Sequence, residues 1–195
     1  MGELSVINSN EREILRSLAK KVAEYAELPI MNDRRDRWIR HNRLEKGKPM
    51  ILVFPEGAWH ELVPKTSLQC ESDLAREIEW KLRARIFRHE VINDDFVVEK
   101  DYHVMKHISH TGWGVEPAQS LSNNSSGSEW GLDSFVGCVP KVWDKNFKFN
   151  SESFAFEPVI QSPSDLKKIK YPEVVYDEAK SLKEFDVVQD LFGDI

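Results

Sequence analysis

Chemistry-bearing side chains gather just after an apolar run in the first third of the chain. The run covers residues 50–54, and the polar, glycine-containing turn that follows it holds Glu56, Trp59, His60 and Glu61. A continuous apolar run of this length is typical of a parallel strand covered on both faces, and ligands bind at the carboxyl ends of such strands. A carboxylate there could bind a cation or an ammonium group, or act as an acid or base if burial raises its pKa. The alternative is a turn with solvated carboxylates.

Trp59 and Glu61 are candidates for binding a substrate. Cys70 and Trp113 are two further candidates. Cys70 precedes a predicted helix, and a thiolate near a helix N-terminus can have a lowered pKa. A buried structural cysteine is the alternative for this position. Trp113 stands between two glycines, where its indole could lie over a ligand or pack on the core beside a tight turn.

Three closely spaced histidines, His103, His107 and His110, raise the question of a metal site. Imidazoles are common metal ligands, but no nearby cysteine completes a recognisable motif. On a strand, His110 would point away from the face that the other two share. We therefore expect surface histidines, and no metal site in this segment.

The charge balance excludes some classes of partner. A net charge of -6 and an isoelectric point of about 5.6 argue against nucleic-acid and anionic-membrane binding. The arginine-rich run over 34–43 is interspersed with acids, which predicts a solvated helix face with local ion pairs. The sequence has neither a secretory leader nor a membrane-spanning apolar run, and two cysteines are too few for a disulfide scaffold. We expect a cytoplasmic protein without a nucleic-acid or membrane partner.

Residues 1–47 are predicted to form a helical N-terminal extension. Asn10 followed by Glu13 has the spacing of a capping box, and an apolar stripe with i, i+4 spacing follows. Pro29 is expected to end the first helix. The second helix is expected to begin near Asn32 and to run to Gly47.

Residues 48–99 have the pattern of a strand, a helix and a second strand. The strands are predicted over 50–54 and 94–99, and the helix over 73–91, where apolar residues recur every four positions: Leu74, Ile78, Leu82 and Ile86. A strand–helix–strand unit of this length would have a right-handed crossover. The sequence therefore predicts the first βα units of an α/β domain.

The second half of the chain departs from this rhythm. Residues 100–157 are predicted to be a β-rich insertion or lid, because short alternating segments and polar turns dominate them. Over 158–195 helices return, with a Ser-Pro-Ser-Asp cap at 162–165 and a last helix over 172–186. The chain then stops where a third strand is expected, which predicts one incomplete domain.

The order of several local motifs resembles the N-terminal part of the uroporphyrinogen decarboxylase superfamily. These motifs are Arg34-Arg-Asp-Arg-Trp38, the strand entry Lys48-Pro-Met-Ile-Leu and the segment Glu157-Pro-Val-Ile-Gln-Ser-Pro-Ser-Asp-Leu166. The superfamily includes cobalamin-dependent and coenzyme M methyltransferases, and its members are TIM barrels. The resemblance covers most of the chain outside 100–150. It implies the N-terminal portion of a TIM (β/α)8 barrel, with a helical lead-in and a β-rich insertion.

One departure from the family bears on the reaction. In the decarboxylases the first strand leads into an Arg-Gln-Ala-Gly-Arg-Tyr turn whose arginines hold substrate carboxylates. Here Gly57 and Trp59 match that turn, but Phe54 and Ala58 stand in place of the arginines. Arginine forks are what bind a polycarboxylate in a bidentate manner, so porphyrinogen decarboxylation is not expected. The family's catalytic Asp follows the second strand, and the resemblance implies that either Glu99 or Asp101 takes that place here.

The resemblance implies that the intact parent is an enzyme, with Glu56 and Glu99 as catalytic candidates. The expected reaction is transfer of a methyl group from a small methylated substrate to a corrinoid protein. A decarboxylase of another substrate and a non-catalytic interaction module are the alternatives. No cofactor is expected in this segment, which would be inactive alone. The zinc ligands of the methyltransferases come mainly from the second half of their barrel, so zinc and the corrinoid protein belong to the full-length enzyme. A homodimer stays open.

Overall fold

The computed structural model describes residues 7–55, 58–115, 119–120, 155–156 and 158–195. Glu56 and most of the segment over 100–157 therefore lie outside the described residues. The chain divides into two compact units. The first, which we call the helical unit, includes the described residues up to 102 and residues 189–195. The second, the ribbon unit, includes the described residues between 103 and 188.

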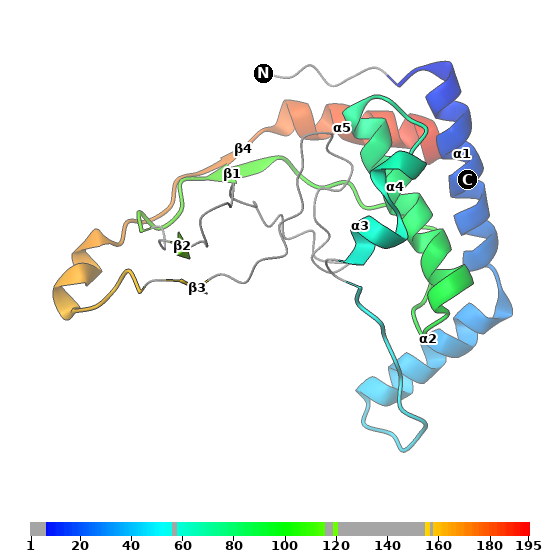
Figure 1. Cartoon of the computed structure of the whole chain (residues 1–195), viewed down its shortest axis with the longest axis horizontal. Coiled ribbons are helices and arrows are strands. Elements are labelled where there is room, and N and C mark those ends of the chain that lie inside the picture. The colour runs from blue at the N-terminus through cyan, green and yellow to red at the C-terminus, as the bar shows by residue number, and fades with distance from the viewer. Residues whose placement is uncertain (1–6, 56–57, 116–118, 121–154, 157) are drawn as a thin grey trace. The chain divides into compact units, whose positions relative to one another are not determined.

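The helical unit is built around two helices that lie side by side, α1 (Ser9–Ala26) and α4 (Asp73–Phe87) (Figure 1). Leu15, Ala19 and Val22 are buried on α1, and apolar side chains of α4 such as Ile78 are fully buried. Burial of each large aliphatic side chain contributes about 2 kcal/mol. The remaining helices are α2 (Pro29–Asn42), the short α3 (Trp59–Leu62), the 3-10 turn η2 (Lys65–Ser67) and the π-helical turn η3 (Arg88–Ile92).

An aromatic cluster joins α3 to α4. Trp59 and Trp80 are both buried, with ring centroids 5.9 Å apart in an edge-to-face arrangement, and Val63 and Ala84 complete the cluster. The indole nitrogen of Trp80 donates to the carbonyl of Val63 at 3.2 Å, so the polar edge of the ring is satisfied.

Ion pairs and hydrogen bonds of Arg88, Asp94 and Asp95 connect the segment at 51–53 to the segment at 93–96. Asp94 and Arg88 form a buried ion pair at 2.7 Å. Asp94 also accepts the N–H of Val53, and Arg88 donates to the carbonyl of the same residue. Asp95 in turn accepts the N–H of Ile51 at 2.9 Å. Side chains thus supply most of the hydrogen bonds that a neighbouring strand would otherwise give, and one main-chain bond, from the N–H of Asp95 to the carbonyl of Ile51 at 2.9 Å, joins the two segments directly.

This arrangement contradicts the predicted α/β fold. Residues 50–54 and 94–99 form no strand, and Ile51, Val53 and Phe54 are exposed rather than covered on both faces. The part of the chain that the structure describes is mostly helical, and its paired strands form antiparallel two-stranded sheets. A parallel βαβ unit, and with it a portion of a TIM barrel, is therefore wrong for these residues.

The helices themselves were predicted with shifted ends. Asn8, rather than Asn10, caps α1, and its partner in the capping box is Glu11. α2 begins at Pro29 rather than near Asn32 and ends at Asn42 rather than at Gly47. Pro29 thus starts the second helix instead of ending the first, consistent with the preference of proline for the first turn. The helix predicted to begin at Asp73 is confirmed, and it continues after Phe87 into the π-helical turn η3.

The arginine-rich run of α2 is not simply a solvated face. Arg34 is buried, and it donates to the carbonyl of Phe96 and to the side chain of Asn93. Arg37 pairs with Asp95 at 2.7 Å. These contacts attach α2 to the turn that follows η3.

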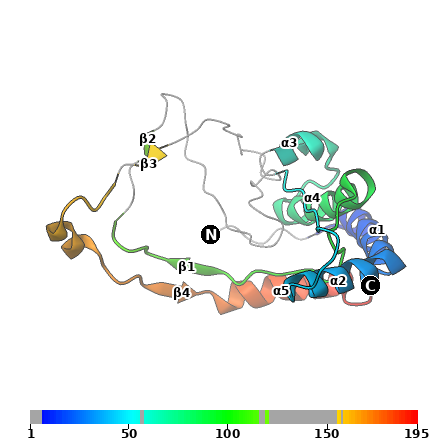
Figure 2. The ribbon, with the colours of Figure 1, turned by 90° about the horizontal axis from the view of Figure 1, so that it is seen from below.

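The ribbon unit contains an extended antiparallel pair, β1 (Ile108–His110) and β4 (Val174–Tyr176), which run side by side in Figure 2. A second pair joins β2 (Gln119–Ser120) to β3 (Ala155–Phe156). The 3-10 helix η4 (Pro163–Lys168) begins at the predicted cap, where Ser162 and Asp165 form a capping box. This cap is confirmed.

The predicted β-rich insertion and the last helix both need correction. The described strands have two or three residues each, and β1 pairs with β4, which lies in the range assigned to the last helix. That helix, α5 (Glu178–Phe192), begins only after Asp177, whose carboxylate accepts the N–H of Lys180. Val175 and Leu182 are exposed, so neither lies on a buried face. The β-branched pair at 174–175 favours a strand over a helix here.

The buried pair of Arg88 and Asp94 gives a test of this fold. Asp94→Ala leaves a buried guanidinium unpaired, so we expect it to lower the free energy of unfolding by about 3–5 kcal/mol. The matched control is Asp33→Ala, because Asp33 forms an exposed pair with Arg37 within α2 and should contribute less than about 1 kcal/mol. Urea unfolding of both variants measures the difference. Equal losses would show that the buried pair does not organise this region.

Candidate functional site

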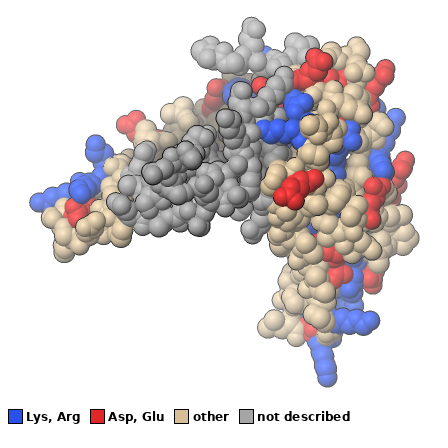
Figure 3. All heavy atoms as spheres, viewed as in Figure 1, with Lys and Arg blue, Asp and Glu red and all other residues tan. Residues whose placement is uncertain are grey.

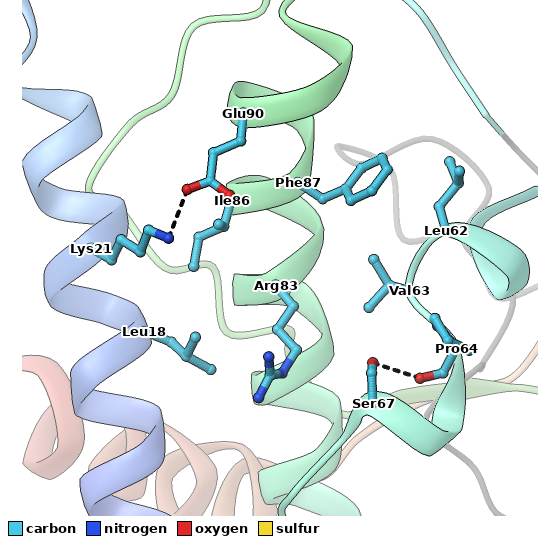
Figure 4. Close-up of a pocket in the computed structure, with 10 residues that line it drawn as sticks. All are labelled: Leu18, Lys21, Leu62, Val63, Pro64, Ser67, Arg83, Ile86, Phe87 and Glu90. Carbon is cyan, nitrogen blue, oxygen red and sulfur yellow. Dashed lines mark hydrogen bonds and ion pairs between the residues drawn. The ribbon is translucent and has the colours of Figure 1, made fainter.

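An open pocket of about 330 Å³ lies between α1, α4 and the segment from α3 to η2 (Figure 4). One wall comes from Leu18 of α1 and Ile86 of α4, and the opposite wall from the apolar residues at 62–64. The full lining is Leu18, Lys21, Leu62, Val63, Pro64, Ser67, Arg83, Ile86, Phe87 and Glu90. The pocket therefore combines an apolar surface with two cations and one carboxylate.

The charged groups at one end of the pocket neutralise one another. The ammonium of Lys21 lies 2.7 Å from the carboxylate of Glu90, and the hydroxyl of Tyr25 donates to the same carboxylate. The hydrogen bond with Glu90 raises the pKa of Lys21, and the bond with Lys21 lowers the pKa of Glu90. Both side chains therefore stay charged at neutral pH as a pair.

At the other end, Arg83 is linked to a buried carboxylate. Its Nε donates to Glu79 at 2.7 Å, and Glu79 also accepts the main-chain N–H groups of Gln69 and Cys70. Burial would raise the pKa of Glu79, but the N–H groups of Cys70 and Gln69 and the Arg83 guanidinium outweigh it and lower that pKa. Glu79 therefore stays ionised, and its hydrogen bonds hold the segment that precedes α4.

The same environment makes Cys70 a poor nucleophile. Its side chain is buried, and burial, together with the negative charge of Glu79, raises the pKa of the thiol to about 12. Reactive cysteines instead have lowered pKa values in electropositive surroundings. The structural alternative for Cys70 agrees with this placement.

The other predicted residues of the first turn fall on α3. Trp59 is only 1% exposed and packs in the aromatic cluster, while the side chain of Glu61 is 75% exposed and lies 3.5 Å from the imidazole of His60. Trp59 and Glu61 thus lie on the same short helix, where Trp59 is buried and Glu61 is exposed. Glu56, the first catalytic candidate, lies outside the described residues.

Glu99 lines a second, polar pocket of about 340 Å³, which also includes Ala26, Val98, Lys100 and Asp101. Its carboxylate is half exposed and lies 3.7 Å from the guanidinium of Arg35, another residue of this pocket. An exposed, paired carboxylate of this kind has the character of a surface ion pair.

Trp113 belongs to the ribbon unit. The residue is 56% exposed, and the centroid of its ring lies 6.4 Å from that of Tyr171. Gly112 and Gly114 both have positive φ, and a Cβ on Gly114 would lie 3.2 Å from the carbonyl oxygen of Lys168, so this turn requires glycine. Whether the indole contacts a ligand stays a prediction.

The histidines of the ribbon unit have protein partners. His107 lies 2.6 Å from Glu184, and the Nδ1 of His110 accepts the N–H of Gly112. Within the described ranges, no three His, Cys, Asp or Glu side chains come together as metal ligands would. The structure describes no helix that is long and apolar enough to cross a bilayer.

The buried carboxylates were not predicted from the sequence. Glu11 is 2% exposed and accepts N–H groups of Glu71 and Ser72, so it connects the start of α1 to the start of α4. Burial would raise the pKa of Glu11, but the N–H groups of Ser72, Asn8 and Glu71 lower it overall. Two sequence patterns indicate these residues, namely the capping-box spacing of Glu11 and the i, i+4 spacing of Glu79 and Arg83.

Comparison of the chain with protein-family models, curated proteins and solved structures found no significant match. The resemblance to the uroporphyrinogen decarboxylase superfamily therefore stays a prediction from motif order.

The raised pKa of Cys70 predicts an inert thiol. A pKa of about 12 in place of 9.0 lowers the thiolate fraction by on the order of a thousandfold. In a Cys138→Ser background, we expect a disulfide reagent at pH 8 to label Cys70 only as fast as the protein opens. Leu44→Cys, added to a Cys70→Ser/Cys138→Ser background, is the exposed control, because Leu44 is 93% exposed. Equal labelling rates at the two positions would contradict this placement.

The lowered pKa values of Glu11, Glu79 and Asp94 predict acid sensitivity. As pH falls below about 4.5, the unfolded chain takes up protons before the folded chain does. The stabilisation is therefore complete above that pH and is lost as pH falls toward the lowered native values. Urea midpoints measured from pH 7 to pH 3 should fall, and Glu79→Gln should lower the midpoint at pH 7 while flattening its decline. A midpoint independent of pH would contradict this.

Proposed function

We propose that this chain is the N-terminal, accessory part of an enzyme similar to the uroporphyrinogen decarboxylase superfamily. The intact parent would transfer a methyl group from a small methylated substrate to a corrinoid protein in the cytoplasm. The order of the motifs over 34–38, 48–52 and 157–166 supports the family. Phe54 and Ala58, in place of the two arginines of the decarboxylases, favour methyl transfer over porphyrinogen decarboxylation.

One observation carries the accessory role: the buried carboxylates of the helical unit are committed to holding the chain. Glu11, Glu79 and Asp94 each accept two or more hydrogen bonds from main-chain N–H groups or arginine, and all three have lowered pKa values. A general acid or base needs a pKa near the working pH, which for a carboxyl group means a raised one.

The catalytic candidates that remain are at the surface or outside the described residues. Glu99 lies in an open pocket beside Arg35, and Glu56 follows the extended segment over 50–55. We propose that either residue contributes to chemistry only where the rest of the parent enzyme covers it.

The test compares this chain with the product of the complete reading frame that contains it. Both are assayed for methyl transfer from methylated amines and aryl methyl ethers to a corrinoid protein, followed by corrinoid absorbance. We expect turnover only with the complete product. Glu99→Gln should lower its kcat by about tenfold or more, the scale of an acid–base group.

Glu24→Gln in the complete product is the matched control, because Glu24 is an exposed carboxylate of α1 with no proposed part in the reaction. Turnover by the 195-residue chain alone, or a reading frame that stops after Ile195, would contradict the accessory role. Release of carbon dioxide from a carboxylated substrate without methyl transfer would favour the decarboxylase alternative.

A further inference from the structure

The pocket between α1, α4 and η2 presents an arginine that is paired with Glu79 but whose hydrogen-bond donors are only partly used. Arg83 extends from α4 into the space between α1 and η2 (Figure 4). Its Nε is bonded to Glu79, but its two terminal nitrogens have no hydrogen-bond partner among the described residues. Its side chain is 26% exposed, so the guanidinium is partly withdrawn from water and an incoming anion would interact with it more strongly than at the open surface.

The other charges of the pocket restrict which anion fits. Lys21 is already neutralised by Glu90, and Glu90 itself lines the pocket. A second negative charge on the ligand would therefore be repelled by the carboxylate of Glu90, because Lys21 is already paired with that carboxylate. A planar monocarboxylate matches the flat fork of a single guanidinium and carries one charge.

The remaining surface of the pocket is apolar. Leu18 and Ile86 face the apolar side chains at 62–64 across the hollow, and Phe87 extends from α4 toward Leu62, as Figure 4 shows. A volume of about 330 Å³ is at the lower end of the range for small-molecule sites. The hydrophobic effect would hold an aliphatic or aromatic body of modest size against these walls.

We propose that this pocket binds a small amphipathic monocarboxylate, with its carboxylate on the terminal nitrogens of Arg83 and its apolar body against Leu18, Ile86 and Phe87. The site goes beyond the proposed function, because it lies within the helical unit and includes none of the candidate catalytic residues. In the overall view of Figure 3, acidic and basic side chains intermingle on the visible face of the helical unit. The distinguishing feature of the proposed site is therefore local, namely one guanidinium at the edge of an apolar wall.

The probe is octanoate, added below its micellar concentration to the full 195-residue chain and followed by calorimetry and methyl NMR shifts. We expect saturable binding of octanoate that is about tenfold tighter than that of 1-octylamine or octyl phosphate. A tenfold difference corresponds to about 1.4 kcal/mol in the free energy of binding. Shifts should centre on the methyl groups of Leu18, Val63 and Ile86. Octylamine or octyl phosphate binding as tightly as octanoate would overturn the charge assignment.

Two variants separate the pocket from nonspecific hydrophobic binding. Leu18→Trp should fill the pocket and abolish octanoate binding, whereas Leu182→Trp, on the exposed part of α5, is the matched control and should leave it unchanged. Arg83→Lys keeps a positive charge beside Glu79 but loses the fork, and should weaken binding several-fold. Circular dichroism confirms that each variant is folded. Unchanged binding in Leu18→Trp, or equal binding in Arg83→Lys, would overturn the proposal.

Discussion

The need to neutralise a buried guanidinium organises one end of the helical unit. Arg88 is 3% exposed, and it meets Asp94, the carbonyl of Val53 and the face of the Phe96 ring, which lies 4.1 Å from the guanidinium carbon. Removing such a charge from water is costly unless these partners are all in place. The positions of the 51–53 segment and of the turn after η3 follow from that requirement.

The same principle recurs at the other end of the unit. Glu11 accepts N–H groups at the start of both α1 and α4, where helices leave donors unsatisfied, and Glu79 accepts those of the preceding loop. Carboxylates therefore connect the irregular segments to the helices. The apolar contacts between α1 and α4 supply the core, while these acids determine how the loops attach to it.

Local patterns predicted the helices better than the extended segments. The helix at Asp73 and the cap at Ser162 depend on neighbours within four residues, which sequence spacing records directly. The apolar run over 50–54 has the composition of a covered strand, but whether a partner strand exists is a non-local fact that the run does not encode. Likewise, Glu79 on α4 and Arg34 on α2 are charged residues whose burial depends on partners elsewhere in the chain. Of the candidate sites, the structural alternative for Cys70 was foreseeable, and the α1–α4 pocket was not.

The attachment of residues 51–53 has a consequence for how this protein can change. A strand inside a sheet shares its main-chain hydrogen bonds with neighbours, so replacing it disturbs the whole sheet. Here the attachment depends mainly on the side chains of Arg88, Asp94 and Asp95, beside one main-chain bond from the N–H of Asp95 to the carbonyl of Ile51. A few substitutions could therefore release or re-route this segment while the packing of α1 against α4 persists. The segment itself is accordingly open to evolutionary variation on a fixed helical frame.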